Sequence, residues 1–196
     1  MRIIAGEFRS RRIKTPEGLE VRPTPDRLRE TLFNILAPEI EGSVFLDAYA
    51  GSGAVGIEAI SRGAAQTIFV EKHRTAFMML QENTVELGLK ARALLVKGSA
   101  RLTLERFDPD IVFIDPPYEL EAEYHAVLEM LGEKPPGLVT VVQHSARFSL
   151  KDRYGKIKRT RVKKQGDNSL SFYRVADLEE PKLDGSADPD PENLSG

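Results

Sequence analysis

Apolar, strand-forming segments alternate with amphipathic helical segments through the middle of this chain, and this alternation limits the possible fold more than any other feature. Strand runs that are apolar on both faces and joined by helices predict a parallel sheet covered on both sides. At 196 residues, the chain has room for one α/β domain with a modest appendage. The expected strands are 44–48, 67–71, 92–97, 110–115 and 138–143, and the expected helices are 54–63, 73–88, 99–106 and 121–132.

Two more strand-like segments, 156–163 and 169–175, follow without a helix between them. A turn sequence at 166–168 separates them, so they are expected to close the sheet as a hairpin. We therefore divide the chain into a core domain at 39–176, an N-terminal extension at 1–38 and a tail at 177–196. The tail is acidic and rich in Pro, Gly and Ser, and we expect it to be disordered.

The N-terminal extension has its own pattern. Residues 2–15 suggest two short strands around a turn, and a helix that ends before residue 38 is expected to follow. Thr24 is the expected N-cap of that helix, Pro25 suits its first position, and Pro38 is expected just past its end. Its polar face carries Arg27, which by default is a solvent-exposed position.

Composition excludes several chemistries. The chain has no cysteine, which rules out disulfides, cysteine-based zinc sites and thiol nucleophiles, including those of cysteine-dependent C5-pyrimidine methyltransferases. The three histidines are far apart in sequence, so we expect no metal site. No apolar run approaches the ~18 residues of a membrane helix and no secretory pattern opens the chain, so we expect a cytoplasmic protein.

The net charge of −2 conceals an asymmetry. Residues 177–196 carry −6, which leaves +4 on residues 1–176. Residues 147–164 alone hold nine basic residues and one acidic residue, with aromatic residues among them. Such a cluster suits the phosphate backbone of a nucleic acid, although a solvated strand face would look the same.

The segment FLDAYAGSGAVGIEA (45–59) leaves a strand, turns through glycines and opens a helix. Gly51, Gly53 and Gly56 match the dinucleotide-binding pattern, with Glu71 about 20 residues further on, so a nicotinamide oxidoreductase is one candidate. Asp47 disfavours it, because a carboxylate at the mouth of the strand would repel a pyrophosphate. The same carboxylate would attract a cationic ligand.

S-adenosylmethionine fits this pattern, because it carries an ammonium group, a sulfonium and a ribose but no phosphate. Asp47 and the glycine loop are expected to hold its methionine end, while Glu71 accepts hydrogen bonds from the ribose hydroxyls. The segment KGSA (97–100) lies where an adenine edge would be bound. The candidate cofactor-binding residues are Asp47, Ala50, Gly51, Ser52, Gly53, Glu71, Lys72, Ser99, Ala100 and Asp115.

A second motif, DPPY (115–118), ends the fourth strand at the same edge of the sheet. An amino group on a planar ring is a poor nucleophile because its lone pair is delocalised. The Asp115 carboxylate and the Pro116 carbonyl would each accept one of its N–H groups and aim the lone pair at a methyl donor. Tyr118 would stack on the flipped base. These three are the candidate catalytic residues.

The motifs DAYAGSG and DPPY, together with Glu71, resemble the amino-group branch of Rossmann-like S-adenosylmethionine methyltransferases. The segments RIIAGEFRSRRIKTP, RPTPDRLRETLFNIL and FLDAYAGSGAVGIEAISRGA resemble the bacterial RsmD family. This family methylates the N2 amino group of one guanine in small-subunit ribosomal RNA. The resemblance runs from about residue 2 to residue 175.

The resemblance implies a seven-stranded methyltransferase sheet with the last strand antiparallel. It implies that the N-terminal segment, including Arg22, Thr24, Arg27 and Glu30, borders the pocket. The candidate substrate-binding residues are Arg22, Thr24 and Arg27 from this segment, together with Tyr118 of DPPY. Family members tend to carry a glutamate after the fifth strand where this chain has QHS (143–145), so Gln143 and His144 receive no catalytic role.

Small-subunit ribosomal RNA or a 30S assembly particle is the expected partner, and we expect a monomer. An adenine-N6 or cytosine-N4 amino methyltransferase remains the nearest alternative. A non-catalytic RNA-binding module is another, although DPPY argues against it.

Overall fold

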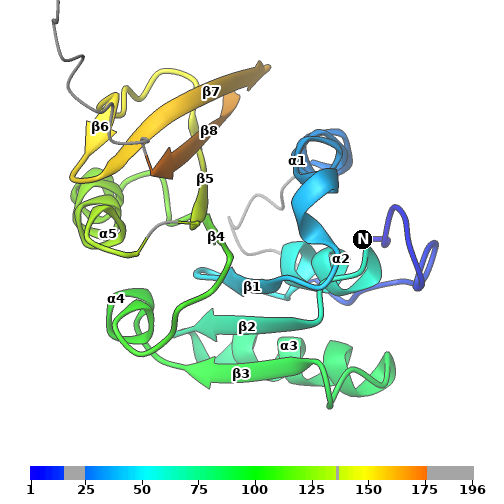
Figure 1. Cartoon of the computed structure of the whole chain (residues 1–196). Coiled ribbons are helices and arrows are strands. Elements are labelled where there is room, and N and C mark those ends of the chain that lie inside the picture. Colours follow the sequence, from blue (N-terminus) through cyan, green and yellow to red (C-terminus); the bar gives the residue numbers. More distant parts are fainter. Residues whose placement is uncertain (16–24, 136, 176–196) are drawn as a thin grey trace, which may run out of the picture.

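The computed structural model describes residues 1–15, 25–135 and 137–175, in which helices cover both faces of one sheet (Figure 1). The helices are α1 (Asp26–Ile40), α2 (Ala54–Ser61), α3 (Arg74–Glu86), α4 (Ala100–Leu104) and α5 (Glu121–Gly132). The strands are β1 (Val44–Asp47), β2 (Gln66–Glu71), β3 (Ala93–Lys97), β4 (Ile111–Ile114), β5 (Val139–Ser145), β6 (Arg153–Tyr154), β7 (Ile157–Gln165) and β8 (Asn168–Val175).

The strand order is β3-β2-β1-β4-β5-β8-β7-β6. The first five strands in this order are parallel, and β8, β7 and β6 each run antiparallel to the strand before them. The expected α/β class and the closing hairpin are confirmed, with β8 antiparallel to β5. After β5 the chain forms β6 and β7 at the outer edge of the sheet, and the β7–β8 hairpin then places β8 between β7 and β5.

The expected count of seven strands is wrong, because the sheet has eight. The additional strand, β6, has two residues and pairs only with the first two residues of β7. Gly155 makes the tight turn between them at φ +52°. The turn is pressed against α5, where a Cβ added to Gly132 would lie 2.3 Å from the Tyr154 carbonyl oxygen. This close approach to the helix produces a strand pair that the sequence pattern does not show.

Helix α1 differs from its expected end. Its N-cap is Pro25, and it continues through Pro38 to Ile40. Proline removes one helical hydrogen bond, but Leu36 and Ile40 are both buried on the core-facing side, which favours keeping the last turn helical. The expected N-cap, Thr24, lies outside the described residues.

The N-terminal segment does not form the two expected strands. Residues 1–15 contain one isolated bridge, between Arg2 and Arg12. The two halves of the segment still bond to each other around a turn, since the Ile3 N–H donates to the Arg11 carbonyl and the Ile13 N–H to the Met1 carbonyl. The expected turn is therefore present, but the pairing is too short to count as two strands. The same backbone also bonds to α2: the Ile4 and Ala5 N–H groups donate to Glu58, and the Glu7 N–H donates to the Ser61 carbonyl.

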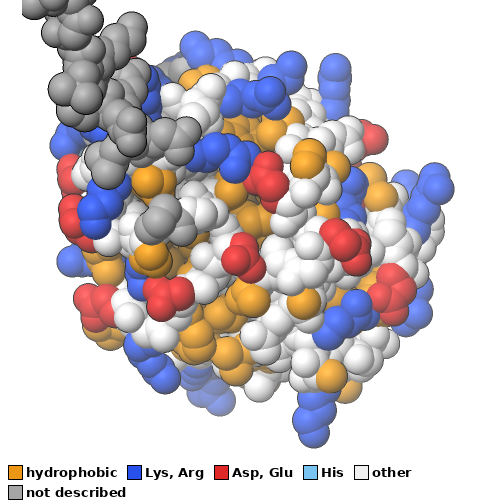
Figure 2. Space-filling view, viewed as in Figure 1, with side chains coloured by type: hydrophobic (Ala, Val, Ile, Leu, Met, Phe, Trp, Pro, Cys, Tyr) orange, Lys and Arg blue, Asp and Glu red, His pale blue; other side chains and the backbone are white. Residues whose placement is uncertain are grey.

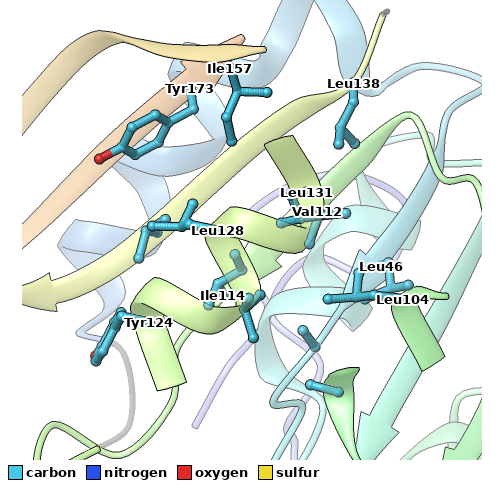
Figure 3. Packing of buried hydrophobic residues seen from close by; sticks show 14 of the residues in the cluster. Leu46, Leu104, Val112, Ile114, Tyr124, Leu128, Leu131, Leu138, Ile157 and Tyr173 are labelled. Atoms are coloured by element: carbon cyan, nitrogen blue, oxygen red, sulfur yellow. The ribbon is translucent and has the colours of Figure 1, made fainter. Parts of the chain in front are cut away.

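Two apolar layers flank the sheet. On one face, α4 and α5 pack on the strands through a cluster that includes Leu104, Leu128 and Tyr173 (Figure 3). On the other face, α1 and α2 cover β1, β4, β5 and β8, and α2 and α3 share a third cluster with Ile3 and Ile13. Helix α1 thus belongs to the main core, and the division into an extension at 1–38 and a domain at 39–176 stays a prediction.

Glu58 on α2 is the link between the N-terminal segment and the domain. Its side chain is fully buried, accepts the Ile4 and Ala5 N–H groups at 2.8 and 3.0 Å, and pairs with Arg62 at 2.8 Å. The guanidinium of Arg29 on α1, also fully buried, lies 3.8 Å away. One carboxylate therefore joins the N-terminal segment, α1 and α2.

We predict that Glu58→Ala destabilises the fold by about 3–5 kcal/mol, because it removes the acceptor of two backbone N–H groups and the buried carboxylate beside the Arg29 guanidinium, which keeps only Asp26 as a charged partner. Urea unfolding measures the loss, and hydrogen exchange should speed up at Ile4 and Ala5. Glu129→Ala is the control, because that carboxylate forms an exposed pair with Lys151 and should cost less than about 1 kcal/mol. Equal effects of the two substitutions would contradict the prediction.

Candidate active site

The glycine loop leaves β1 at the centre of the sheet. Gly51 and Gly53 adopt φ +55° and +88°, values that other residues rarely adopt. A Cβ on Gly53 would lie 2.5 Å from Leu80 Cδ1, whereas a Cβ on Gly51 would meet nothing within 4 Å. The loop is therefore packed against α3 on one side and open above Gly51, as a site for a ligand requires.

Asp47, the last residue of β1, is 2% exposed. Its Oδ2 accepts the N–H of Gly56, in the first turn of α2, at 3.0 Å. Burial is the main cause that raises its pKa, to about 7, and the nearby Glu71 carboxylate adds to the rise. Asp47 thus holds the start of α2 in place, a structural role that the sequence did not reveal.

Glu71, at the end of β2, ties two loops together. Its Oε2 accepts the N–H of Gly51 at 2.8 Å and its Oε1 accepts the N–H of His73 at 2.7 Å. A carboxylate has about four lone-pair positions, so each oxygen retains one for a ligand hydroxyl. The predicted ribose-binding role is compatible with these bonds and stays a prediction.

Asn83 on α3 is a residue of the site region that sequence analysis missed. It is 1% exposed, and its amide nitrogen donates to the carbonyls of Ser52 and Lys14 at 2.9 and 3.0 Å. Its Oδ1 accepts the Lys14 N–H at 2.9 Å. Asn83 therefore fixes the glycine loop to the N-terminal segment, and no local pattern signals that contact.

The remaining candidate cofactor residues line the same edge of the sheet. Lys72 is exposed directly after β2, and Ser99 is the half-buried N-cap residue of α4 after β3. Ala100 and Ala50 are buried, and the Ala50 N–H donates to the Val70 carbonyl at 2.9 Å. The parallel topology thus brings the ends of β1, β2 and β3 together as expected.

The DPPY motif follows β4, the strand beside β1. Pro116 is buried, and its carbonyl accepts the hydroxyl of Tyr124 on α5 at 3.0 Å. Burial raises the pKa of Tyr124, which keeps the phenol protonated as a donor. A carbonyl has two lone pairs, so one remains for a substrate amine. Tyr124 fixes the direction of this acceptor and was missed by sequence analysis.

Tyr118 is half-buried and connects the motif to the hairpin. Its hydroxyl donates to Oδ1 of Asn168 at 2.6 Å, and Asn168 is the first residue of β8. This bond from loop to hairpin limits the ring's rotation. A ring held in this way is suited to stacking on a base, because the side chain loses little conformational entropy when the base binds.

The candidate substrate residues are only partly described. Arg27 lies on the exposed face of α1, whereas Arg22 and Thr24 fall outside the described residues. Helix α1 does approach the hairpin, since Thr31 Oγ1 lies 3.5 Å from Gln165 Oε1 at the end of β7. The exposed face of α1 and the end of β7 are thus neighbours near the site.

The site favours a cationic ligand over a phosphate. Asp47 and Glu71 bring two carboxyl groups beside the glycine loop, and Glu71 adds to the rise in the pKa of Asp47 that burial mainly causes. A pyrophosphate would meet like charge there, whereas an ammonium or sulfonium would be stabilised. In the part of the chain that the structure describes, no three His, Cys, Asp or Glu residues come together as a metal site, and no helix is long and apolar enough to cross a membrane.

An α/β sheet of this order, with a glycine loop after β1, an acid after β2 and DPPY after β4, defines a class I methyltransferase. Enzymes of this class take S-adenosylmethionine as their methyl donor. The carboxylate pair and the open space above Gly51 fit that cofactor.

Comparisons with known proteins agree with this class. The family model described as Conserved hypothetical protein 95 matches residues 1–174. The chain is 31% identical over 183 residues to YlbH of Bacillus subtilis, a match that covers 89% of this chain and 98% of YlbH. It is 42% identical over 120 residues to the ribosomal RNA small subunit methyltransferase D of Escherichia coli, covering 60% of each chain.

A solved structure of Escherichia coli yhhF has a TM-score of 0.77 at 34% identity and covers 89% of this chain and 97% of that one. A Haemophilus influenzae structure follows at a TM-score of 0.73 and 30% identity, with 90% and 98% coverage. The chain therefore belongs to the RsmD family of methyltransferases, which confirms the expected family. The nicotinamide oxidoreductase alternative is dropped on these findings.

We predict that the stability of the protein without ligand falls as the pH rises from about 4 to about 7. Asp47 keeps its proton in the folded state up to a pKa of about 7, whereas the unfolded chain releases it near its ordinary value of about 4. Across this window the folded state binds more protons, so rising pH favours unfolding. Urea unfolding at pH 5 and pH 8 measures this.

Asp47→Asn is the matched variant, since the amide can still accept the Gly56 N–H without a buried charge. The variant should gain stability relative to the original chain at pH 8, and much less at pH 5. A constant difference between the two pH values would show that Asp47 does not titrate in this window.

Proposed function

We propose that this chain transfers a methyl group from S-adenosylmethionine to the N2 amino group of a guanine in small-subunit ribosomal RNA. The observation that carries the proposal is the pair of acceptors at Asp115 and Pro116, on the strand beside the carboxylate-lined glycine loop. Relatives named as small-subunit ribosomal RNA methyltransferases support the substrate class.

S-adenosylmethionine, when bound, supplies an electrophilic methyl group on a sulfonium. The Asp47 region and the glycine loop would hold the amino-acid end of this cofactor, and Glu71 would accept its ribose hydroxyls. Ser99 and Ala100, after β3, would border the adenine. These roles use groups that already lie at one edge of the sheet, so binding needs little rearrangement.

The chain's contribution to the reaction is to position the amine. Asp115 and the Pro116 carbonyl would each accept one N–H of the amino group, which draws the nitrogen toward tetrahedral geometry. A nitrogen–carbon bond then forms as the carbon–sulfur bond breaks. The nitrogen must afterwards lose one proton, and we assign that proton to the Asp115 carboxylate, which accepts one of its N–H groups. Tyr118, restrained by Asn168, would hold the plane of the base.

The test is methyl transfer from labelled S-adenosylmethionine with unmodified small ribosomal subunits, their naked RNA and duplex DNA, followed by nucleoside analysis. We expect N2-methylguanosine from a ribosomal sample. Asp115→Ala should lower the rate by more than about a hundredfold while cofactor affinity changes less than about threefold, because the residue acts on the amine. Label in methyladenine or methylcytosine would replace the guanine proposal with the rival amino methyltransferase.

An equal loss of transfer and cofactor binding in Asp115→Ala would instead mean that the residue supports the fold. A thermal melt of the variant separates these cases, because a folded variant with normal cofactor affinity leaves only the chemical role.

The structure divides the basic cluster of residues 147–164 into two groups. Arg159 pairs with Asp152, and Lys151 and Lys156 lie beside Glu129 and Glu133. The other six are exposed and make no ion pair with the described residues: Arg147, Arg153, Lys158, Arg161, Lys163 and Lys164.

From residue 160 to residue 164 every residue of β7 is exposed, so both faces of this part of the strand meet solvent, and β6 pairs only with the first two residues of β7. Figure 2 shows lysine and arginine side chains along the upper rim of the molecule, where Figure 1 places the far end of β7. We propose that this end of β7 contacts RNA phosphates. A solvated strand face, the other interpretation of the cluster, would bind no RNA.

Replacing the cations near the end of β7 by alanine should weaken RNA binding by about tenfold or more at moderate salt and reduce the salt dependence of binding. Filter binding across a salt series measures both quantities. A loss that does not depend on salt would remove these residues from the interface. The test variant changes Arg161, Lys163 and Lys164, and the control of equal charge changes Lys134, Lys151 and Lys156, which already pair with carboxylates.

A further inference from the structure

Gln143, near the end of β5, carries a buried acceptor with no partner. The residue is 2% exposed, and its Oε1 makes no hydrogen bond with the described residues. Burying a carbonyl oxygen without a partner costs about 1–3 kcal/mol. A polar group that is kept at such a cost deserves a functional explanation.

The register places Gln143 on the same face of the sheet as the reaction site. Gln143 pairs with Leu170 across the antiparallel β5–β8 ladder, so their side chains share a face, and Leu170 belongs to the cluster beneath α1. Phe113 and Val141, paired between β4 and β5, belong to that cluster too. This is the face on which Asp47 bonds to α2.

Asp115 and Gln143 lie two residues beyond Phe113 and Val141 respectively. Neighbouring parallel strands are about 4.8 Å apart, and side chains two residues apart share a face. Continued one residue past the last pair, Ile114 and Val142, this register sets Asp115 beside Gln143 at one edge, as the acceptor for the amine and a second acceptor next to it.

The other unpartnered buried atoms are placed differently. Thr140 and Ser169 hydroxyls sit at alternate positions of β5 and β8, so they point to the opposite face. His144 also points there, where its Nε2 lies 2.9 Å from the Ser171 hydroxyl.

The remaining two such atoms, Arg29 Nε and Glu39 Oε2, belong to charged groups whose other atoms are bonded. Among the described residues, Gln143 alone combines an unpartnered buried acceptor with a place beside Asp115.

The chemistry of the target base supplies the missing partner. In guanine, the N2 amino group is adjacent to a ring N1–H, which is a donor. In adenine and cytosine, the ring nitrogen adjacent to the amino group is an acceptor. An acceptor placed beside the amine-binding carboxylate would therefore form a hydrogen bond with the N1–H of guanine. It would meet a second acceptor in adenine or cytosine, which disfavours binding of those two bases.

We propose that Gln143 Oε1 accepts the N1–H of the target guanine and thereby selects guanine over adenine and cytosine. The inference rests on the proposed guanine-N2 methylation and adds the residue that sets its base specificity. Tyr118 would then hold the base by its face, while Asp115 and Gln143 hold its edge.

The experiment compares substrates that differ at N1. Once the modified nucleotide is mapped, small-subunit RNA is assembled by ligation with guanine, 2,6-diaminopurine or 2-aminopurine at that position. Both analogues keep the 2-amino group but carry an acceptor at N1, and they differ from each other at C6. We expect kcat/KM to favour guanine over each analogue by about 10- to 100-fold.

Gln143→Leu should reduce this preference to less than about threefold. Leucine cannot accept a hydrogen bond from the N1–H of guanine, and it does not repel the N1 lone pair of the analogues. Gln143→Glu should keep the preference, since a carboxylate is also an acceptor. The matched control is Thr140→Val, which removes an unpartnered buried hydroxyl from the other face of β5 and should leave the preference unchanged. Urea midpoints no lower than that of the original chain would show that each variant is folded.

Three results would overturn the inference. If the original chain methylates guanine and both analogues at equal rates, Gln143 does not read N1. If Gln143→Leu keeps the full preference, another group sets specificity. If the original chain modifies no guanine in any ribosomal sample, the proposed function fails, and this inference fails with it.

Discussion

Parallel pairing of β1 with both β2 and β4 is the constraint on which the site depends. The chain passes from β1 outward to β2 and β3 and then returns to β4 on the other side of β1. Ligands bind at such a reversal in open α/β sheets, because loops on either side of the central strand diverge there. The ladder even continues past β1, where the Ala48 N–H bonds to Phe113 and the Ala50 N–H bonds to Val70. The glycine loop is thus tied to both neighbouring strands.

Several polar groups at this edge lower the stability of the unliganded fold. Asp47 is buried with a raised pKa, and Gln143 keeps an acceptor without a partner. Both would gain a partner in the proposed complex: Asp47 a nearby cation and Gln143 a ring N–H. Functional sites commonly hold such groups, because a group that is already satisfied within the protein has less to offer a ligand.

Residues outside the motifs support the proposed substrate side of the site. Tyr124 fixes the Pro116 carbonyl and Asn168 fixes the Tyr118 hydroxyl. The buried pair of Arg29 and Glu58 holds α1 against α2, so the helix that borders the hairpin is anchored to the core. Precise positioning of an amine requires this support, because small displacements of the acceptors weaken catalysis strongly.

The sequence by itself determined the alternating α/β order, the glycine loop, the strand-end acids and DPPY, because these depend on local patterns of apolar residues, glycines and prolines. It overestimated the strands of residues 2–15, whose two halves pair around a turn with a single bridge, and it misjudged the end of α1, where burial of Ile40 outweighs the local preference of Pro38. Only the tertiary structure decided that Tyr124, Asn168, Asn83 and Gln143 matter to the site region. Their partners lie 8 to 69 residues away in sequence, or on a neighbouring strand, so no spacing along the chain encodes them.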